Sequence, residues 1–215
     1  MSLEYNGYSA QDLFVIYSTN KKTNGTYLEI GTNHPINYNN TYVLESKYNW
    51  YGFLVEYSNE FTELYKLHRP KSYPIIRDAT TINFLEEFEK VNFPKNIDYL
   101  QVDLDVDNCS TLTTLKNLNS QLFDSYKFAT VTFEHDIYRG DYYNTRSISR
   151  EIFNSHGYIR VFSDIHAGIY YGEYEDWYVH PELVNMDYIN KIKTDTPSLL
   201  KDEVIKILED NYQTH

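Results

Sequence analysis

The sequence predicts an α/β fold, in which a largely parallel sheet is covered by helices on both faces. Along the 215 residues, short apolar runs typical of buried strands alternate with segments whose apolar residues recur at helical spacing. Acidic residues follow the ends of several of the apolar runs. Because the carboxyl ends of parallel strands meet at one edge of a sheet, we expect these acids to surround a ligand site.

The first half of the chain is expected to begin with a helix and to continue with alternating strands and helices. The expected helices cover residues 11–17, 37–48, 58–68 and 81–91, and the expected strands cover residues 27–30, 52–56 and 74–77. Ile82, Leu85, Phe88 and Val91 recur every third residue, which indicates a helix. Ser58 is the expected N-cap of the helix that it precedes.

The second half continues the same alternation. Its expected strands cover residues 97–102, 128–133, 158–163 and 176–180, its helices residues 111–123, 146–156 and 199–212, and its main loops residues 136–145 and 164–173. Gly157 suits the end of a helix, and the preceding His156 is interpreted as a residue stabilised by the helix dipole. Trp177 and Tyr178 are interpreted as core residues.

Length and composition predict one domain over residues 1–215, with a helical lead-in at 1–25 and a terminal helix at 198–215. The net charge of −12 repels phosphate backbones, so we expect no nucleic-acid partner. The single Cys109 excludes an internal disulfide framework. No membrane span or leader pattern is recognised, which predicts a cytoplasmic protein, and the oligomeric state stays open.

The most informative segment is TYLEIGTN at residues 26–33, an apolar strand closed by an acid and a glycine. A second apolar run, YGFLVE, follows and ends on Glu56. A strand, a glycine turn, a helix and a strand ending in an acid form the opening of a nucleotide-binding half. Gly31 lets the backbone approach a ligand, and Glu56 can accept both hydroxyls of a ribose.

Taken in order, several segments resemble the FkbM-type family of class I S-adenosylmethionine (SAM)-dependent methyltransferases. They are TYLEIGTN, NNTYVLE, YGFLVE, RDAT, IDYLQVDLD, VTFEHD, SREIFNSHGY and EDWYVHPELV, which together extend from about residue 11 to residue 184. The resemblance implies a Rossmann-like sheet of seven mostly parallel strands with the last one antiparallel. It also implies SAM as cofactor, S-adenosylhomocysteine (SAH) as product, and a hydroxyl of a sugar or other small metabolite as methyl acceptor.

The resemblance also assigns cofactor-binding residues. Those expected against the methionine portion and its amino group are Glu29, Gly31, Thr32, Asn33 and Asn40. Glu56 would bind the ribose, Asp78 and Ala79 would flank the adenine, and Asp103 would lie beside the sulfonium. This chain has Thr32-Asn33-His34-Pro35 where family members often have a second glycine, so the shape of the first loop departs from the family pattern.

The catalytic candidates follow the strand at residues 128–133. His135 is the candidate base, because imidazole titrates near neutral pH and an acceptor hydroxyl must lose its proton. Alternatively, Asp103 and Glu134 would hold a magnesium ion that orients acceptor oxygens. A calcium loop is disfavoured, since the Asp103-x-Asp105 pattern lacks the required glycine and distal glutamate.

The acidic rim around these residues predicts a neutral or cationic polyhydroxylated acceptor, with the tyrosines of residues 170–174 stacking on a sugar ring. Two other functions are weighed. A catalytically inactive binding module with the same fold is supported by the unusual first loop. A nicotinamide dehydrogenase is disfavoured, because no complete G-x-G-x-x-G follows the first strand.

Overall fold

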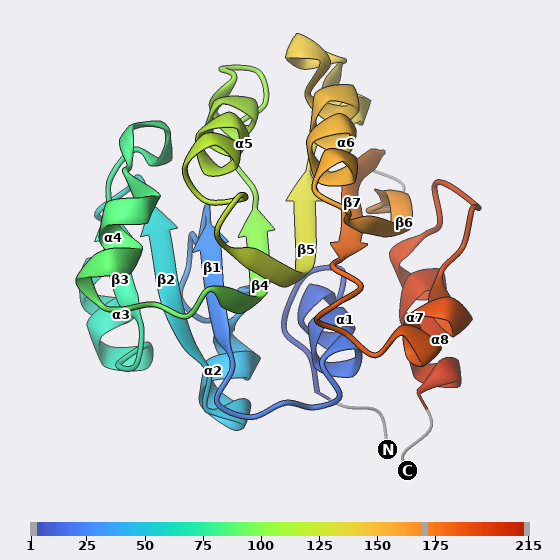
Figure 1. Cartoon of the computed structure of the whole chain (residues 1–215), viewed down its shortest axis with the longest axis horizontal. Helices are drawn as coiled ribbons and strands as arrows, with labels where there is room; N and C mark the ends of the chain where they lie inside the picture. The colour runs from blue at the N-terminus through green and yellow to red at the C-terminus, as the bar shows by residue number, and fades with distance from the viewer. Residues whose placement is uncertain (1–3, 169–171, 213–215) are drawn as a thin grey trace.

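The computed structural model describes residues 4–168 and 172–212, and its centre is one seven-stranded sheet in the order β3-β2-β1-β4-β5-β7-β6. The strands are β1 (Thr26–Ile30), β2 (Tyr51–Glu56), β3 (Tyr73–Ile76), β4 (Asn96–Val102), β5 (Lys127–Glu134), β6 (Ile159–His166) and β7 (Glu173–Val179). Strands β1 to β5 pair in parallel, and β7 lies antiparallel between β5 and β6. Figure 1 shows β7 running opposite to β5. The predicted fold class is confirmed.

Helices cover both faces of the sheet. They are α1 (Gln11–Ser18), α2 (Tyr42–Tyr48), α3 (Thr62–His68), α4 (Phe84–Lys90), α5 (Ser110–Gln121), α6 (Thr145–Ser155), α7 (Met186–Ile192) and α8 (Lys201–Asn211). Phe88, Leu115 and Phe153 of α4, α5 and α6 belong to one core cluster. Helices α1, α2, α7 and α8 contribute to the second cluster, which contains the fully buried Trp177. No helix in the described part of the chain is long and apolar enough to cross a bilayer.

Several predicted boundaries are wrong. Ser58 does not cap α3, which begins at Thr62; its hydroxyl instead accepts the Glu60 backbone N–H at 3.2 Å, ahead of the helix. The helix predicted over 37–48 begins only at Tyr42, since the preceding residues form a loop. Part of the predicted loop 164–173 is strand, because β6 extends to His166 and β7 begins at Glu173.

Helix α7 was not predicted, although its start carries a recognisable signal. The side chain of Asn185 accepts a hydrogen bond from the Asp187 backbone N–H at 3.0 Å. An asparagine in this position is a common N-cap. The helix is short, and its polar flanks conceal the apolar positions Tyr188, Ile189 and Ile192.

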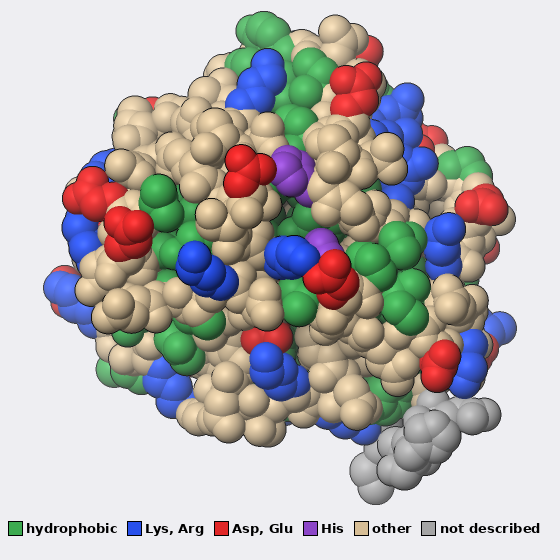
Figure 2. Space-filling model, in the orientation of Figure 1, with side chains coloured by type: hydrophobic (Ala, Val, Ile, Leu, Met, Phe, Trp, Pro, Cys, Tyr) green, Lys and Arg blue, Asp and Glu red, His purple; other side chains and the backbone are tan. Residues whose placement is uncertain are grey.

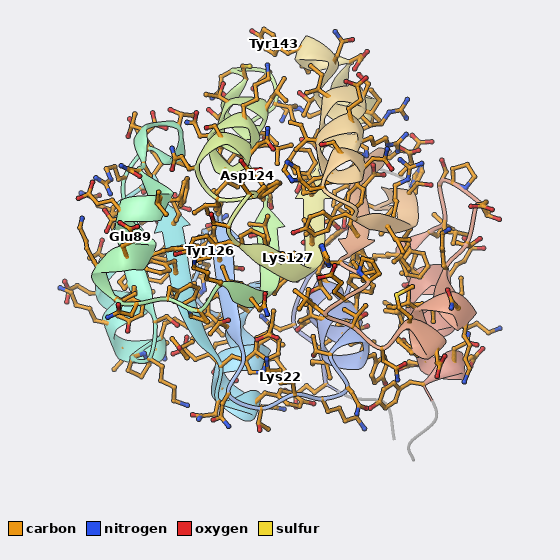
Figure 3. All side chains as sticks on the ribbon, viewed as in Figure 1. Lys22, Glu89, Asp124, Tyr126, Lys127 and Tyr143 are labelled. Atoms are coloured by element: carbon orange, nitrogen blue, oxygen red, sulfur yellow. The ribbon has the colours of Figure 1, made fainter. Side chains whose placement is uncertain are left out.

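The two ends of the parallel strands differ in their surroundings. At the amino ends, Asp98 pairs with Lys22 at 2.7 Å and accepts the Thr26 backbone N–H at 2.9 Å, which fixes the start of β1. Figure 3 shows Lys22 below the strands and Tyr143 beyond their carboxyl ends. The loop that carries Tyr143 therefore lies at the carboxyl ends of the strands.

A buried arginine ties the loop after β1 to the sheet. The guanidinium of Arg69 donates to Glu45, Pro35, Asn39, Tyr27 and Thr41, at distances from 2.5 to 3.2 Å. The Arg69 side chain is 0% exposed and that of Glu45 is 4% exposed. Guanidinium has five N–H donors, so these partners satisfy it fully. Arg69 therefore joins β1, α2 and the loop after β1 into one unit.

Replacing this arginine should destabilise the protein strongly. Arg69→Met leaves the Glu45 carboxylate buried without its cation, and breaking such a pair costs about 3–5 kcal/mol. Lys66→Met is the matched control, because its ion pair with Glu63 is exposed and such pairs contribute about 0–1 kcal/mol. Urea denaturation measures both changes. Equal effects of the two substitutions would contradict the role given to Arg69.

Candidate functional site

A cavity of about 660 Å³ opens at the carboxyl ends of β1, β4 and β5. Predicted site residues that line it are Glu29, Gly31, Thr32, Asn33, Asn40, Asp103 and Glu134. Four others, Glu56, Asp78, Ala79 and His135, are not part of its lining. The structure therefore gathers the residues assigned to the methionine portion, but it does not bring every predicted site residue to the cavity.

Glu29, at the end of β1, is held by the loop that follows it. Its carboxylate accepts hydrogen bonds from the Thr41 hydroxyl at 2.7 Å, the Asn39 side-chain amide at 3.1 Å and the Asn40 backbone N–H at 3.2 Å. Burial raises the pKa of Glu29, although these bonds and nearby Arg69 oppose that rise. The loop and the strand end thus form one preorganised wall of the cavity.

Gly31 allows two strands to approach closely. Its φ is +84°, and a Cβ at this position would lie 1.7 Å from the backbone oxygen of Asp103. A side chain would therefore push the end of β4 away from the end of β1. Gly31 was predicted to let the backbone approach a ligand. In the structure, the group that lies close to Gly31 is the backbone of Asp103. Contact of Gly31 with a cofactor stays a prediction.

The unusual first loop is fixed by side chains rather than by a second glycine. The Asn33 backbone N–H donates to Glu56 at 2.8 Å, and the Tyr65 hydroxyl donates to the Asn33 carbonyl. The ring of His34 accepts from the backbone N–H groups of Ile36 and Asn37, at 3.1 and 3.0 Å. These bonds give the loop a defined shape that the sequence pattern did not indicate.

Glu56 and Asp78 use their carboxylates within the chain. Glu56 accepts the backbone N–H of Asn33 at 2.8 Å and that of Ser58 at 2.9 Å. Asp78 accepts the backbone N–H and the hydroxyl of Thr80, at 2.9 and 2.7 Å, and caps the short helix that contains Ala79. Their assigned contacts with ribose and adenine stay predictions.

Two carboxyl groups share a proton at the floor of the cavity. Asp103 and Glu134 are in hydrogen-bond contact, and burial raises the pKa of Asp103 to about 6. The pKa of Glu134 is raised well above its usual value by burial and by the negative charges of Asp103 and Asp136. At neutral pH Glu134 therefore holds the proton and donates it to ionised Asp103, which can accept a proton from a ligand.

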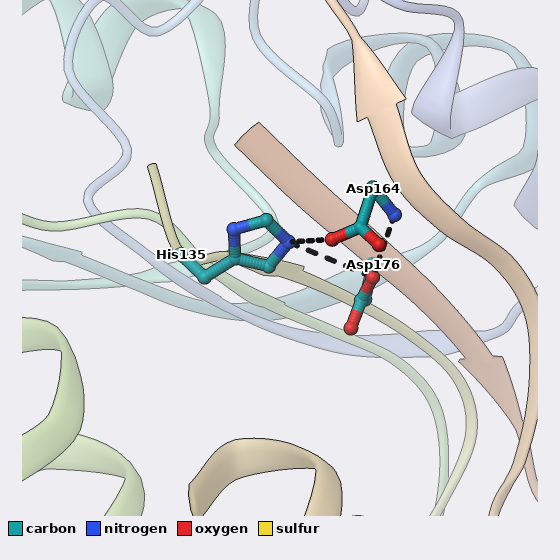
Figure 4. Close-up of side chains that lie close together, drawn as sticks. All are labelled: His135, Asp164 and Asp176. Carbon is teal, nitrogen blue, oxygen red and sulfur yellow. Dashed lines mark hydrogen bonds and ion pairs between the residues drawn. The ribbon is translucent and has the colours of Figure 1, made fainter. Parts of the chain in front are cut away.

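His135 lies on the opposite side of the sheet, because successive residues of a strand point to opposite faces. Its buried ring lies 3.4 Å from Asp164 and 3.6 Å from Asp176, measured from Nε2, as Figure 4 shows. Its Nδ1 accepts the Ile137 backbone N–H at 3.3 Å. The structure therefore places His135, the candidate base, away from the cavity that Asp103 lines.

The surroundings of His135 form a buried ion network. Arg150 donates to Asp176 at 2.7 and 2.9 Å and to Asp164 at 2.7 Å, and Arg146 donates to Asp164 at 3.0 Å. Burial lowers the pKa of His135, but its two carboxylate partners outweigh burial and raise it. The same network lowers the pKa values of Asp164 and Asp176. The network joins β5, β6, β7 and α6.

Metal binding finds little support in this geometry. Among the described residues, the one group with donor atoms close enough to share an ion is His135, Asp164 and Asp176, within 4.8 Å of one another. Arg146 and Arg150 already neutralise both of its carboxylates. Asp103 and Glu134 belong to no group of three or more such residues, so nothing among the described residues supports the magnesium alternative.

Sequence reasoning missed several cavity residues. Gln101 and Gln11 line the cavity, and Gln11 donates to the Tyr174 hydroxyl at 3.3 Å and to Glu175 at 3.2 Å. Gln101 lies two residues before Asp103 on β4, so strand alternation was the available signal. Of the aromatic residues expected at 170–174, Tyr174 lines the cavity, whereas Tyr170 and Tyr171 lie outside the described residues.

No family model and no curated protein matches the sequence. Solved structures do resemble it in fold. One is a putative rRNA methylase from Clostridium thermocellum, with a TM-score of 0.53 and 12% identity, covering 82% of this chain and 99% of that chain. Another is a TehB-like SAM-dependent methyltransferase from Corynebacterium glutamicum, with a TM-score of 0.49 and 10% identity, covering 79% and 87%. The chain has the class I methyltransferase fold.

Stability should fall as the pH rises from about 5 to 8. Folding raises the pKa values of the buried carboxyls of Asp12, Asp103 and Glu175 to about 7, 6 and 8. The folded state then binds more protons than the unfolded state, so each such group contributes stability at low pH that is lost as the pH passes its folded pKa. Between its unfolded and its folded pKa, each group changes the free energy of unfolding by about 1.4 kcal/mol per pH unit. Denaturation across this range measures it.

A carboxamide substitution can separate the contribution of the cavity acids to this pH dependence from that of the other buried acids. Glu134→Gln mimics the protonated acid and should flatten the pH dependence, whereas the exposed Glu151→Gln should leave it unchanged. A rise in stability between about pH 5 and 8 in the unaltered protein would contradict the assigned protonation states.

Proposed function

We propose that this protein is a SAM-dependent methyltransferase that transfers the methyl group to a hydroxyl of a sugar or other small polyhydroxylated acceptor. The observation that carries the proposal is a cavity at the carboxyl ends of β1, β4 and β5 of the class I methyltransferase fold. Its floor holds a carboxyl pair that can exchange a proton. Membership of the FkbM-type family and a cytoplasmic location belong to the same proposal.

The cavity lining suits a ligand that donates hydrogen bonds. The side-chain oxygens of Asn40 and Gln101 are buried and have no partner among the described residues, and both residues line the cavity. Asn33, Asn40 and Glu29 would hold the amino-acid portion of SAM, whose sulfonium supplies the methyl group. Burial of unpaired acceptors is costly, so a donor-rich ligand would stabilise this wall.

In the proposed reaction, Asp103 takes the role of base that was predicted for His135. As the acceptor oxygen forms its bond to the methyl carbon, the carbon–sulfur bond breaks and the hydroxyl proton moves to the Asp103 carboxylate. Glu134 holds Asp103 in place through their shared hydrogen bond. A base with a pKa of about 6 is well matched to proton transfer near neutral pH.

The acidic surface supports a small acceptor over RNA. The net charge is −12, and on the face in Figure 2 basic side chains are scattered among acidic ones. Such a surface gives little electrostatic attraction for a phosphate backbone. The similarity in fold to a putative rRNA methylase, at 12% identity, does not identify the methyl acceptor of this protein.

One observation favours the alternative of an inactive binding module. The carboxylate of Glu56, assigned to the ribose hydroxyls, already accepts two backbone N–H groups. Calorimetry with SAH separates the alternatives. If Glu56 binds the ribose, Glu56→Ala should weaken SAH binding by about 1–3 kcal/mol. An inactive module would bind SAH weakly or not at all, and unchanged affinity in the variant would remove Glu56 from the site.

The proton-transfer assignment predicts a selective loss of turnover. Asp103→Asn should lower kcat by about 10²–10⁴, because the carboxamide cannot accept the acceptor proton. The exposed Asp124→Asn serves as the control. Transfer of a labelled methyl group from SAM to a panel of sugars measures turnover. Undiminished kcat in Asp103→Asn would exclude Asp103 as the base.

A further inference from the structure

We propose that the acceptor carries a protonated amine, which Asp136, Glu134 and Gln101 bind at the end of the cavity formed by β4 and β5. This inference rests on the proposed function and names the acceptor class more closely, as an amino sugar or a similar amino-polyol. The amine is the group that the protein recognises, while methyl transfer to the neighbouring hydroxyl is unchanged.

The first support is a pair of buried acceptors without donors. Gln101 is 2% exposed and Asp136 is 5% exposed, and both line the cavity. Gln101 Oε1 and Asp136 Oδ1 have no hydrogen-bond partner among the residues that the structure describes. Buried polar atoms in native proteins are normally paired. These two oxygens therefore point to a ligand that supplies N–H or O–H donors.

The second support is the charge of this end of the cavity. Asp103, Glu134 and Asp136 line it together, and no Lys or Arg lines it among the described residues. The nearby Arg139 lies outside the lining, pairing with Asp107 at 3.1 Å and reaching Asp136 Oδ2 only at 3.5 Å. Among the described residues, Arg139 is the one cation paired with these acids, and it leaves Asp136 Oδ1 without a donor. With Glu134 protonated, Asp103 and Asp136 supply the negative charge at this end of the cavity. A ligand that brings positive charge would stabilise them more than a neutral one.

An ammonium group fits these observations better than the other candidates. A neutral hydroxyl supplies one donor and no charge, whereas an ammonium supplies three donors and a full charge. A metal ion needs ligands gathered around one point, but these three acids do not form a group with that spacing. Asp103, Glu134 and Asp136 all line the cavity, and the Glu134 side chain is in hydrogen-bond contact with the other two. This arrangement suits an amine on a larger polar molecule.

The test compares two sugars that differ in charge at one nitrogen. D-glucosamine and N-acetyl-D-glucosamine are titrated calorimetrically into protein saturated with SAH, so that the amino group of SAH is already present. We expect D-glucosamine to bind about tenfold or more tightly, since it makes charge-assisted hydrogen bonds. Asp136→Asn should abolish the preference, and Asp141→Asn, which changes an exposed acid outside the cavity lining, should preserve it.

The outcomes separate the two proposals. Equal affinities for the two sugars, no detectable binding of D-glucosamine, or a preference that survives Asp136→Asn would each overturn the amine assignment. If SAH binds normally in these experiments, the proposed methyltransferase function stands without it. If SAH does not bind to the unaltered protein, the proposed function itself fails, and the amine assignment fails with it.

Discussion

The guanidinium of Arg69 is the interaction on which the shape of the cavity depends. It is fully buried at the end of α3, yet its partners lie on β1, on α2 and in the loop after β1. A buried cation is stable only when its donors are satisfied and its charge is paired, and Glu45 together with four uncharged acceptors meets both needs. The same bonds fix Asn39 and Thr41, which in turn hold Glu29.

This arrangement accounts for the shape of the loop after β1, which has no second glycine. With a single glycine in the first turn, the backbone of residues 32–40 takes its shape from side chains. Asn33 is held by Glu56 and Tyr65, and His34 accepts two backbone N–H groups. The result is a rigid wall beside Glu29, which a binding site requires because a preorganised wall costs little entropy when ligand binds.

Strand alternation divides the segment Glu134-His135-Asp136 between two environments. Glu134 and Asp136 line the cavity with Asp103, whereas His135 enters the ion network of Arg150, Asp164 and Asp176 on the other face. The ion network holds β6 and β7 beside β5. Glu134 and Asp136, which flank His135 in the sequence, line the cavity. One short segment thus contributes both to the stability of the sheet edge and to the polar floor of the site.

Periodicity in the sequence was sufficient to place the strands, since each of the seven lies within a few residues of its predicted position, whereas the antiparallel last strand was implied by the family resemblance. The acids at strand ends also identified the correct edge of the sheet. The sequence could not show which way each side chain points after a strand ends, so His135 was assigned to the wrong face. Arg69 was invisible for a related reason: its partners come from segments that only the folded chain brings together.

A crystal structure of the protein grown with SAH would show whether the cavity is the cofactor site. We expect SAH in the cavity, with its amino-acid portion against Glu29, Asn33 and Asn40 and its sulfur near the Asp103–Glu134 pair. The loop of residues 32–40 should keep its position, because Arg69 already holds it. An empty cavity at saturating SAH, or SAH bound elsewhere on the chain, would contradict the proposal that this cavity is the SAM site.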